Sequence, residues 1–191
     1  MDFALQQWIN HDAGTVPLVD NLMRLAAGAE YVLIAVVAAW LLFGVVSGRL
    51  PDEVGATLAT AASGLALLVN TVVGYLWFRP RPFVDHPGSV HVLLGHPADA
   101  SFPSDHAAAG FAVAAILVMT HRRLGALLLL GSALISYARV YVGDEYPGDI
   151  AGGVVVGVAS ALLVTAIGRG TVRRAWARLP SEWRRARESE G

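Results

Sequence analysis

The sequence contains no cysteine and no lysine, and only 15% of its 191 residues are charged. Without cysteine, neither a disulfide framework nor a thiolate metal site is available, and the redox state of the compartment cannot be inferred. The small charged fraction, combined with 55% hydrophobic residues, is unlike that of a typical soluble domain. The sequence also lacks an internal repeat of fixed period and any low-complexity block. We therefore expect a protein embedded in a lipid bilayer.

Long runs without charged residues predict the membrane-spanning helices, since a helix needs about 20 apolar residues to cross a bilayer. The runs are residues 31–48, 54–78, 107–120, 124–138 and 150–168. Because the third and fourth are short, we expect their helices to include polar residues at one end, at 104–106 and at 139–143. The predicted fold class is all-α, a polytopic transmembrane helix bundle with five to six membrane helices.

Basic residues indicate the orientation of these helices. All fourteen are arginines, and ten of them lie at 49, at 122–123 and in 169–187. Five crossings place these three groups on one side, which the positive-inside rule makes cytoplasmic. The segments 79–104 and 143–149 then face outward. The basic tail, residues 171–191, is predicted to lie on anionic lipid on the cytoplasmic side rather than to bind nucleic acid, because it directly follows a span.

Residues 1–30 lack the basic start and long apolar core of a signal peptide. We expect a segment that lies at the membrane interface or is partly inserted, with a helical periodicity that Pro17 interrupts. A sixth membrane crossing by this segment stays open. Its apolar residues are Phe3, Leu5, Trp8, Ile9, Leu18, Val19, Leu22 and Met23. The predicted organisation is thus this segment, a transmembrane domain over residues 31–170, and the tail 171–191.

A serine, an acid and a histidine stand where a polar loop enters the third apolar run. Ser104 is typical of a helix N-cap, and the free N–H groups of the following turn, together with the helix dipole, favour an anionic ligand. His106 lies in that first turn, where it can give a proton to a departing oxygen. The alternative interpretation of Ser104, Asp105 and His106 is an ordinary capped helix with an incidental histidine.

Two further groups of polar residues flank the predicted spans. Arg79 and Arg81 alternate with prolines that favour an extended backbone, and the guanidinium fork suits phosphate oxygens. Snorkelling to lipid headgroups is the alternative, more readily for Arg79 than for Arg81. Arg139 is a charged residue at the end of an apolar run, with Asp144 its nearest acid, and such residues indicate function. Glu145 and Asp149 then flank a turn before the last span.

The order and spacing of these motifs resemble the three-part signature of the type 2 phosphatidic acid phosphatase superfamily. The matching residues are Arg81-Pro82, Pro103-Ser104-Asp105-His106, and Arg139 followed by position 145 and Asp149. Within that superfamily, the stretches PRPFV and HPADASFPSDH are similar to the bacitracin-resistance branch, the undecaprenyl pyrophosphate phosphatases. The resemblance extends over about residues 70–157 and does not include the N-terminal segment or the tail.

The resemblance implies a bacterial enzyme of the cytoplasmic membrane that hydrolyses undecaprenyl pyrophosphate to the monophosphate at the outer face, in cell wall biosynthesis. Phosphatidic acid and phosphatidylglycerol phosphate are alternative substrates. No metal or other cofactor is implied, and neither oligomeric state nor lipid tail length can be inferred.

It also implies residue roles. The phosphoryl oxygens would be bound at Arg81 and Arg139 and around Ser104, and His106 would protonate the leaving group. Asp149 would orient residue 145, which in the family is a histidine that forms a phosphohistidine. The remaining members of the predicted substrate-binding set are Pro82, Asp105 and Arg79.

The sequence departs from the family pattern at two positions. Gly74 replaces a frequent lysine, a loss of charge that Arg79 is expected to offset in part. Glu145 replaces the histidine nucleophile, and a carboxylate there is repelled by phosphate and by Asp149. Three interpretations remain: an engineered, inactivated variant; a natural member that is inactive or only binds; or a carboxylate nucleophile that forms an acyl phosphate. Electrostatics favours the first two.

Other classes of function fit the sequence less well. The loop residues His86, His91, His96 and Asp99 have no metal-ligand spacing, so solvated loop residues are the simpler interpretation. A lipid-phosphate transporter would also use intramembrane arginines, but paired broken helices are missing. The anion site also resembles that of the vanadate-dependent haloperoxidases, but those enzymes are soluble, and the five apolar runs count against one here. A non-catalytic lipid-phosphate-binding protein differs from the enzyme only at Glu145.

Overall fold

The structure is a computed structural model of the chain, and it describes residues 1–29, 35, 39–40 and 50–177. The span predicted at 31–48 lies almost entirely outside the described residues, and so does the tail beyond residue 177. The described residues form helices joined by loops, with no strand among them. This agrees with the predicted all-α class.

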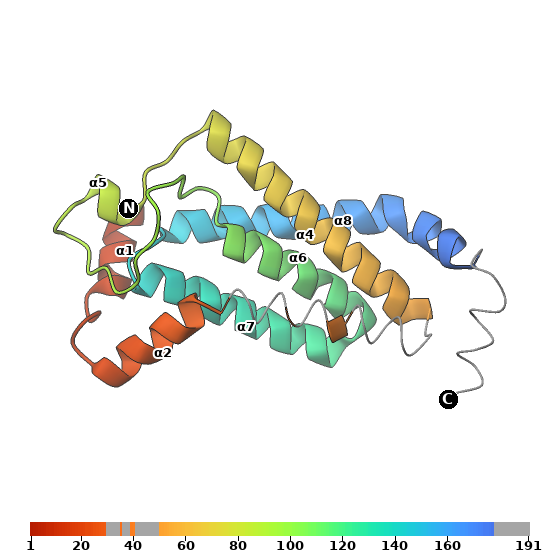
Figure 1. The fold of residues 1–191 in the computed structure, drawn as a ribbon, viewed down its shortest axis with the longest axis horizontal. Helices are drawn as coiled ribbons and strands as arrows, with labels where there is room; N and C mark the ends of the chain where they lie inside the picture. The colour runs from red at the N-terminus through yellow and green to blue at the C-terminus, as the bar shows by residue number, and fades with distance from the viewer. Residues whose placement is uncertain (30–34, 36–38, 41–49, 178–191) are drawn as a thin grey trace.

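Among the described residues, four long helices form a bundle (Figure 1): α4 (Leu50–Leu76), α6 (Asp105–Thr120), α7 (Arg122–Tyr141) and α8 (Pro147–Ala177). Successive helices run in alternating directions. α6 is central, because it packs against each of the other three, while α4 also packs against α8. As a result, the C-terminal ends of α4 and α7 meet the N-terminal ends of α6 and α8 at one end of the molecule.

Three of these helices are long and apolar enough to cross a membrane: Val54–Leu76, Arg122–Tyr141 and Pro147–Gly168. α6 is a shorter apolar helix of 16 residues, which is about 24 Å at the usual helical rise. The helices of the two short runs do include polar residues at one end, but α7 ends two residues before the predicted limit at 143. α6 begins at Asp105 after the N-cap Ser104, and α7 continues through Arg139 to Tyr141.

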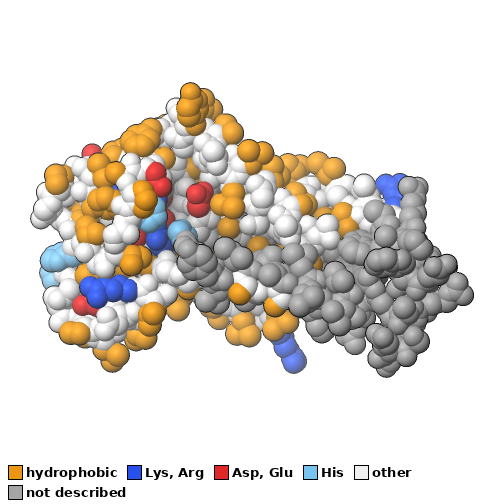
Figure 2. Space-filling view, in the orientation of Figure 1, with side chains coloured by type: hydrophobic (Ala, Val, Ile, Leu, Met, Phe, Trp, Pro, Cys, Tyr) orange, Lys and Arg blue, Asp and Glu red, His pale blue; other side chains and the backbone are white. Residues whose placement is uncertain are grey.

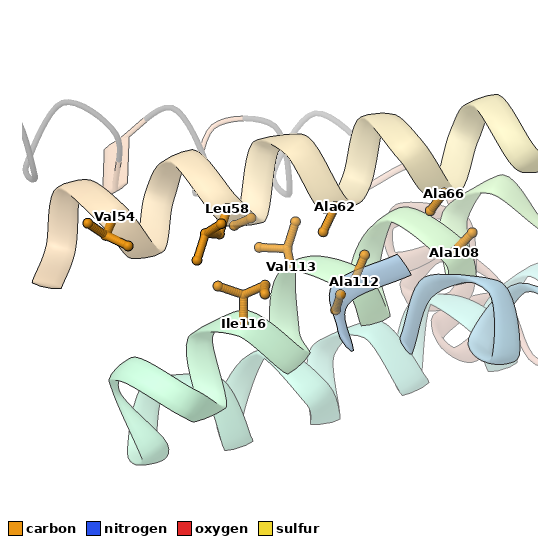
Figure 3. Close-up of a cluster of buried hydrophobic side chains, with 10 residues drawn as sticks. Val54, Leu58, Ala62, Ala66, Ala108, Ala112, Val113 and Ile116 are labelled. Atoms are coloured by element: carbon orange, nitrogen blue, oxygen red, sulfur yellow. The ribbon is translucent and has the colours of Figure 1, made fainter. Parts of the chain in front are cut away.

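Small side chains allow these helices to pack closely. Figure 3 shows Ala62 and Ala66 of α4 facing Ala108 and Ala112 of α6, within a buried cluster that also contains Ile116. On α8, a side chain at Gly153 would contact the carbonyl oxygen of Ser104, and one at Gly157 would contact that of Ala108. The two glycines therefore bring the backbones of α6 and α8 together, as small residues do between membrane helices.

Large apolar side chains cover the outside of the bundle. Leu, Ile and Val residues of α4, α7 and α8 are exposed, among them Leu68, Val72, Leu127, Leu130, Leu134, Val155, Leu162 and Ile167. On the face drawn in Figure 2, most of the visible acidic, basic and histidine side chains gather around α1, α2 and α5, while hydrophobic side chains dominate over α4. This division suits a bundle surrounded by lipid with one polar end.

The N-terminal segment forms two short helices at that polar end, α1 (Asp2–Asn10) and α2 (Pro17–Ala27) (Figure 1). Pro17, expected to interrupt the segment, stands in the first turn of α2. The predicted interfacial face is divided. Trp8 and Leu18 are exposed, whereas Val19 packs against a buried cluster that includes Tyr141. Neither helix is among the candidate spans of the described residues.

The loop between α4 and α6 carries one helical turn, α5 (Pro82–Asp85). The extended backbone predicted for residues 79–83 is therefore only partly correct. Arg81 is extended, with φ −69° and ψ 156°, but Pro82 begins the turn. The physical reason is that the fixed φ of proline and its missing N–H are compatible with the first position of a helix.

Candidate active site

The candidate site lies at the polar end of the bundle and is built from segments that are distant in sequence. Arg81 precedes α5, His106 is in the first turn of α6, and Arg139 is in the last turn of α7. Glu145 lies in the turn between α7 and α8, and Asp149 is in the first turn of α8. The alternating direction of the helices places all of these residues at the same end.

One oxygen atom, Oε1 of Glu145, lies at the centre of this arrangement. It accepts a hydrogen bond from Nε of Arg139 at 3.1 Å and lies 3.9 Å from Nη1 of Arg81. Nδ1 of His106 is 3.8 Å away. The Glu145 side chain is only 2% exposed and that of Arg139 only 3%. Three groups predicted to act on a phosphoryl group thus surround a single buried carboxylate.

Several buried atoms here lack a hydrogen-bond partner within the part of the chain that the structure describes, among them Nη2 of Arg139 and Oε2 of Glu145. A buried guanidinium nitrogen without a partner is costly, since its loss of hydration is uncompensated. An oxyanion bonded to Nη2 would satisfy it. Arg139 can therefore bind an anion through Nη2, which has no hydrogen-bond partner among the described residues.

Asp144 is a second buried carboxylate beside Arg139. Its Oδ2 lies 3.2 Å from Nη1 of Arg139, and its backbone oxygen accepts a hydrogen bond from Nη1 of Arg81 at 3.1 Å. Burial raises the pKa of Asp144 from 3.8 to about 6, although the charges of Arg139, His96 and Arg81 lower it. Asp144 was noted in the sequence only as the acid nearest to Arg139, and the structure makes it part of the site.

The loop between α4 and α6 supplies a partner that the sequence did not predict. Asp99 accepts a hydrogen bond from Nε of Arg81 at 2.7 Å and lies 3.6 Å from Nδ1 of His96. Asp99 was predicted to be a solvated loop residue; its side chain is 55% exposed, but it also orients Arg81. Among the described residues, no group of three or more His, Asp or Glu is suited to hold a metal ion.

Asp149 is completely buried, and its carboxylate organises the turn before α8. Oδ2 accepts hydrogen bonds from Oγ of Ser101 at 2.5 Å and from the backbone N of Tyr146 at 2.8 Å, while Oδ1 accepts one from Arg79 at 2.7 Å. Among the hydrogen bonds of the described residues, none joins Asp149 to the side chain of Glu145. Asp149 thus contacts the backbone next to residue 145, and its predicted orienting role stays a prediction.

Arg79 is directed to Asp149 rather than to Glu145. Its other terminal nitrogen donates to Asp2 of α1 at 2.7 Å, and the guanidinium lies 3.9 Å above the ring of Tyr146. Desolvation lowers the pKa of Arg79, but Asp2 and Asp149 outweigh it and the net pKa is raised. Burial, followed by the charge of Asp85, raises the pKa of the Tyr146 hydroxyl to about 12.

The remaining predicted residues lie around the start of α6. Oγ of Ser104 accepts a hydrogen bond from the backbone N of Ala107 at 3.2 Å, which confirms the predicted N-cap. Asp105 is exposed and accepts a hydrogen bond from Asn70 of α4 at 2.8 Å. Pro82 is buried at the start of α5. These contacts do not test the substrate-binding role predicted for Ser104, Asp105 and Pro82, which stays a prediction.

Gly74, the position where a lysine is frequent, faces the loop between α4 and α6. A side chain there would meet Cβ of Ala100 at 3.3 Å and the backbone oxygen of Phe102 at 3.6 Å. A longer residue would therefore displace this loop or run along it. The charge of Arg79 does not replace a lysine directly, since its two terminal nitrogens already bind Asp2 and Asp149.

The chain is similar to curated proteins and to solved structures. Undecaprenyl-diphosphatase BcrC of Bacillus subtilis is 35% identical over 139 residues, which cover 70% of this chain and 68% of that protein. The putative undecaprenyl-diphosphatase YbjG of Escherichia coli is 35% identical over 124 residues, or 64% of this chain and 62% of its own length. The chain thus spans about two thirds of these relatives.

Among solved structures, Aquifex aeolicus LpxE superposes with a TM-score of 0.72 at 25% identity, over 86% of this chain and 94% of that one. A transmembrane PAP2-type phosphatidylglycerolphosphate phosphatase from Bacillus subtilis gives 0.66 at 20% identity, over 88% and 85%, and supports the fold alone. The sequence model of the PAP2 superfamily matches residues 55–173, which hold every predicted site residue. The chain therefore belongs to the PAP2 superfamily.

Proposed function

We propose that this protein is built as a membrane lipid phosphatase whose substrate is a polyprenyl pyrophosphate, with undecaprenyl pyrophosphate the preferred candidate. The observation that carries the proposal is the convergence of Arg81, His106 and Arg139 on one oxygen of Glu145, within 3.9 Å. Membership of the superfamily and two relatives named as undecaprenyl-diphosphatases support it.

The proposed chemistry needs charge neutralisation, a proton donor and a nucleophile. Arg81 and Arg139 hold the phosphoryl oxygens, and the unpartnered Nη2 of Arg139 is available for one of them. His106 donates a proton to the oxygen of the leaving lipid phosphate as the bond to phosphorus breaks. Residue 145 attacks phosphorus from the opposite side, and water later releases phosphate. Asp149 holds the turn that carries residue 145.

Glu145 changes this mechanism in the present chain. Its carboxylate pairs with the arginines that the phosphoryl group needs, and it repels a phosphate brought near it. We propose that substrate binding is retained in weakened form, since the arginines and His106 are in place, and that turnover is lost. A carboxylate nucleophile that forms an acyl phosphate is the rival interpretation, and the experiment below separates the two.

The proposed site faces the outside of the cytoplasmic membrane, and the tail faces the cytoplasm. Arg122 and Arg123 are exposed at the start of α7, at the end of the bundle opposite Glu145. The long helix α8 ends at that same end (Figure 1), and Arg174 is in its last turn. Arginines near helix ends favour the cytoplasmic side, so the site lies at the other surface.

The test compares the unmodified chain with Glu145→His and Glu145→Gln in detergent or proteoliposomes. Substrates are undecaprenyl pyrophosphate, phosphatidic acid and phosphatidylglycerol phosphate, and released phosphate is measured. We expect Glu145→His to release phosphate at least about 100-fold faster than the unmodified chain, with the pyrophosphate preferred. Glu145→Gln, which removes the charge at constant shape, should bind vanadate more tightly without turnover.

Two outcomes contradict the proposal. If Glu145→His is no faster than the unmodified chain on any substrate, the assignment of residue 145 as the nucleophile position is wrong. If the unmodified chain turns over and Glu145→Gln does not, Glu145 itself is the nucleophile and turnover has not been lost.

A further inference from the structure

The first helix of the chain, α1, lies directly against the candidate site. Its residue Asp2 accepts two hydrogen bonds from residues far away in sequence. Oδ2 accepts one from Nη2 of Arg79 at 2.7 Å, and Oδ1 accepts one from the backbone N of Gly148 at 2.9 Å. Gly148 is in the first turn of α8, so a single carboxylate joins α1, the segment after α4 and the start of α8.

This contact continues to Asp149. Nη1 of Arg79 donates to Oδ1 of Asp149 at 2.7 Å, so the guanidinium is held between two carboxylates. Asp149 is fully buried, whereas the Asp2 side chain is 32% exposed. Arg79 therefore links Asp2 to Asp149. The buried carboxylate of Asp149 in turn accepts a hydrogen bond from the backbone of Tyr146, next to Glu145.

Other residues of α1 support the same contact. Asp2, Gln6 and Asn10 are spaced four apart and thus lie on one face of the helix. Asn10 donates to the backbone oxygen of Tyr141 at 2.7 Å, at the end of α7. Since Asp2 binds the start of α8, this face lies across the turn that contains Glu145. Gln6, between them, is fully buried, and neither of its amide atoms has a partner within the described ranges.

Electrostatics explains why an acid suits this position. A carboxylate near the N-terminus of α8 interacts favourably with the helix dipole and with the free N–H of Gly148. It also balances Arg79, whose charge would otherwise be shared only with Asp149. Removing the charge at residue 2 leaves the guanidinium of Arg79 paired with Asp149 alone. The attraction between Arg79 and Asp149 is then no longer balanced by a second carboxylate.

We propose that Asp2 is a positioning residue of the active site: acting through Arg79, it sets the orientation of Asp149 and of the turn that carries residue 145. The inference rests on the proposed function for its kinetic consequence, but its binding consequence can be measured without turnover. It makes α1 a working part of the site, although the family signature does not include this helix.

The experiment uses the unmodified 191-residue chain and its Glu145→His version, each with Asp2→Asn, Asp2→Glu or Asp12→Asn. Asp12 is the matched control, because its exposed carboxylate pairs with the neighbouring His11 and with no other side chain among the ion pairs of the described residues. Vanadate affinity is measured in the background that keeps Glu145, and kcat and KM are measured in the Glu145→His background. Because 1 Å of misplacement in a catalytic constellation is costly, we expect Asp2→Asn to lower kcat about tenfold with little change in KM. Vanadate affinity should fall as well, Asp2→Glu should restore part of both losses, and Asp12→Asn should change neither.

A second set of variants separates positioning from general destabilisation. Asp2→Asn is combined with Arg79→Gln, and the melting temperature of every variant is recorded. If Asp2 acts through Arg79, Asp2→Asn has no further effect on vanadate affinity once Arg79 is replaced. The inference is overturned if Asp2→Asn behaves like Asp12→Asn, or if its loss is equally large in the Arg79→Gln background. Should Glu145→His release no phosphate, the proposed function fails while the vanadate measurements still decide the role of Asp2.

Discussion

The middle of the bundle and its polar end are held together by different forces. In the middle, Ala62, Ala112 and Gly157 allow helices to approach closely, and contacts are between small apolar groups. At the polar end, Arg79, Arg81 and Arg139 each contact two carboxyl-bearing residues within 4 Å. Close packing therefore stabilises the middle of the bundle, and ion pairs hold the polar end together. Substitutions in the two regions should accordingly have different effects on stability and on anion binding.

The largest effect is expected in the middle of the bundle, from Gly157→Leu. A side chain here would strike the carbonyl oxygen of Ala108, so α8 and α6 must separate. Overpacking of this kind costs about 3 kcal/mol. We expect a lower melting temperature in detergent, and weaker vanadate binding because His106 and Asp149 move apart. A variant with unchanged melting temperature would show that this close packing is dispensable.

At the polar end, Asp144→Asn should make stability less dependent on pH. The pKa of Asp144 is raised from 3.8 to about 6, mainly by burial, so the folded protein holds this proton more tightly than the unfolded chain. Its contribution to stability is complete below about pH 4 and is lost as the pH rises to about 6. Above that pH, Asp144→Asn should be more stable by about 2–3 kcal/mol.

Melting temperatures measured between pH 4 and pH 8, at intervals of about half a pH unit, test this expectation. Asp12→Asn, which alters an exposed carboxylate, is the control. The curves of Asp144→Asn and of the unmodified chain should meet at low pH. Parallel curves over the whole range would contradict the assignment of the effect to Asp144.

A smaller effect, confined to the anion site, is expected from Arg139→Lys. The charge is kept, but a lysine cannot bind Glu145, Asp144 and an external oxyanion with a fixed fork. The loss of one charged hydrogen bond corresponds to about 1.5–3 kcal/mol, or roughly tenfold to hundredfold weaker vanadate binding. The melting temperature should change little. Equal vanadate affinity in both proteins would remove Arg139 from the anion site.

The smallest effect is expected from Gly131→Ala and Gly64→Ala. Apart from the backbone of its own helix, no atom of the described residues lies within 4 Å of a side chain added at either glycine, unlike at Gly157. Alanine should therefore raise helix stability by up to about 1 kcal/mol without changing vanadate affinity. Melting curves of these two variants and of Gly157→Leu, measured together, show whether space or helix propensity governs the response. A marked loss at Gly131 or Gly64 would indicate that packing is tighter than the structure shows.

The sequence predicted the bundle well because its signals are local. Uncharged runs marked α4, α6, α7 and α8, and Ser104 marked the start of α6. The convergence of Arg81, His106 and Arg139 also followed from the sequence, since alternating crossings bring alternate loops to the same side. Gly153 and Gly157 of α8 lie where the backbone of α6 comes closest, as suits small residues between packed helices.

The partners of these arginines were harder to predict. Asp99 lies in an irregular loop, and Asp2 is 77 residues away from Arg79 along the chain. Such contacts carry no periodic signal, because a loop or a terminal helix can place an acid beside an arginine in many ways. Ser101 was likewise only part of a polar stretch until the structure placed its hydroxyl on Asp149. Local pattern thus identifies which residues are charged and where helices begin, but not which charges meet.

The glycine contact between α6 and α8 limits how far residues on these two helices can move apart. His106 and Asp149 are mounted on two helices whose backbones touch at Gly153 and Gly157, so they form one rigid unit. Arg81, in contrast, stands on the loop between α4 and α6. We therefore expect any rearrangement of the site to occur in that loop, while His106 and Asp149 keep their positions relative to each other.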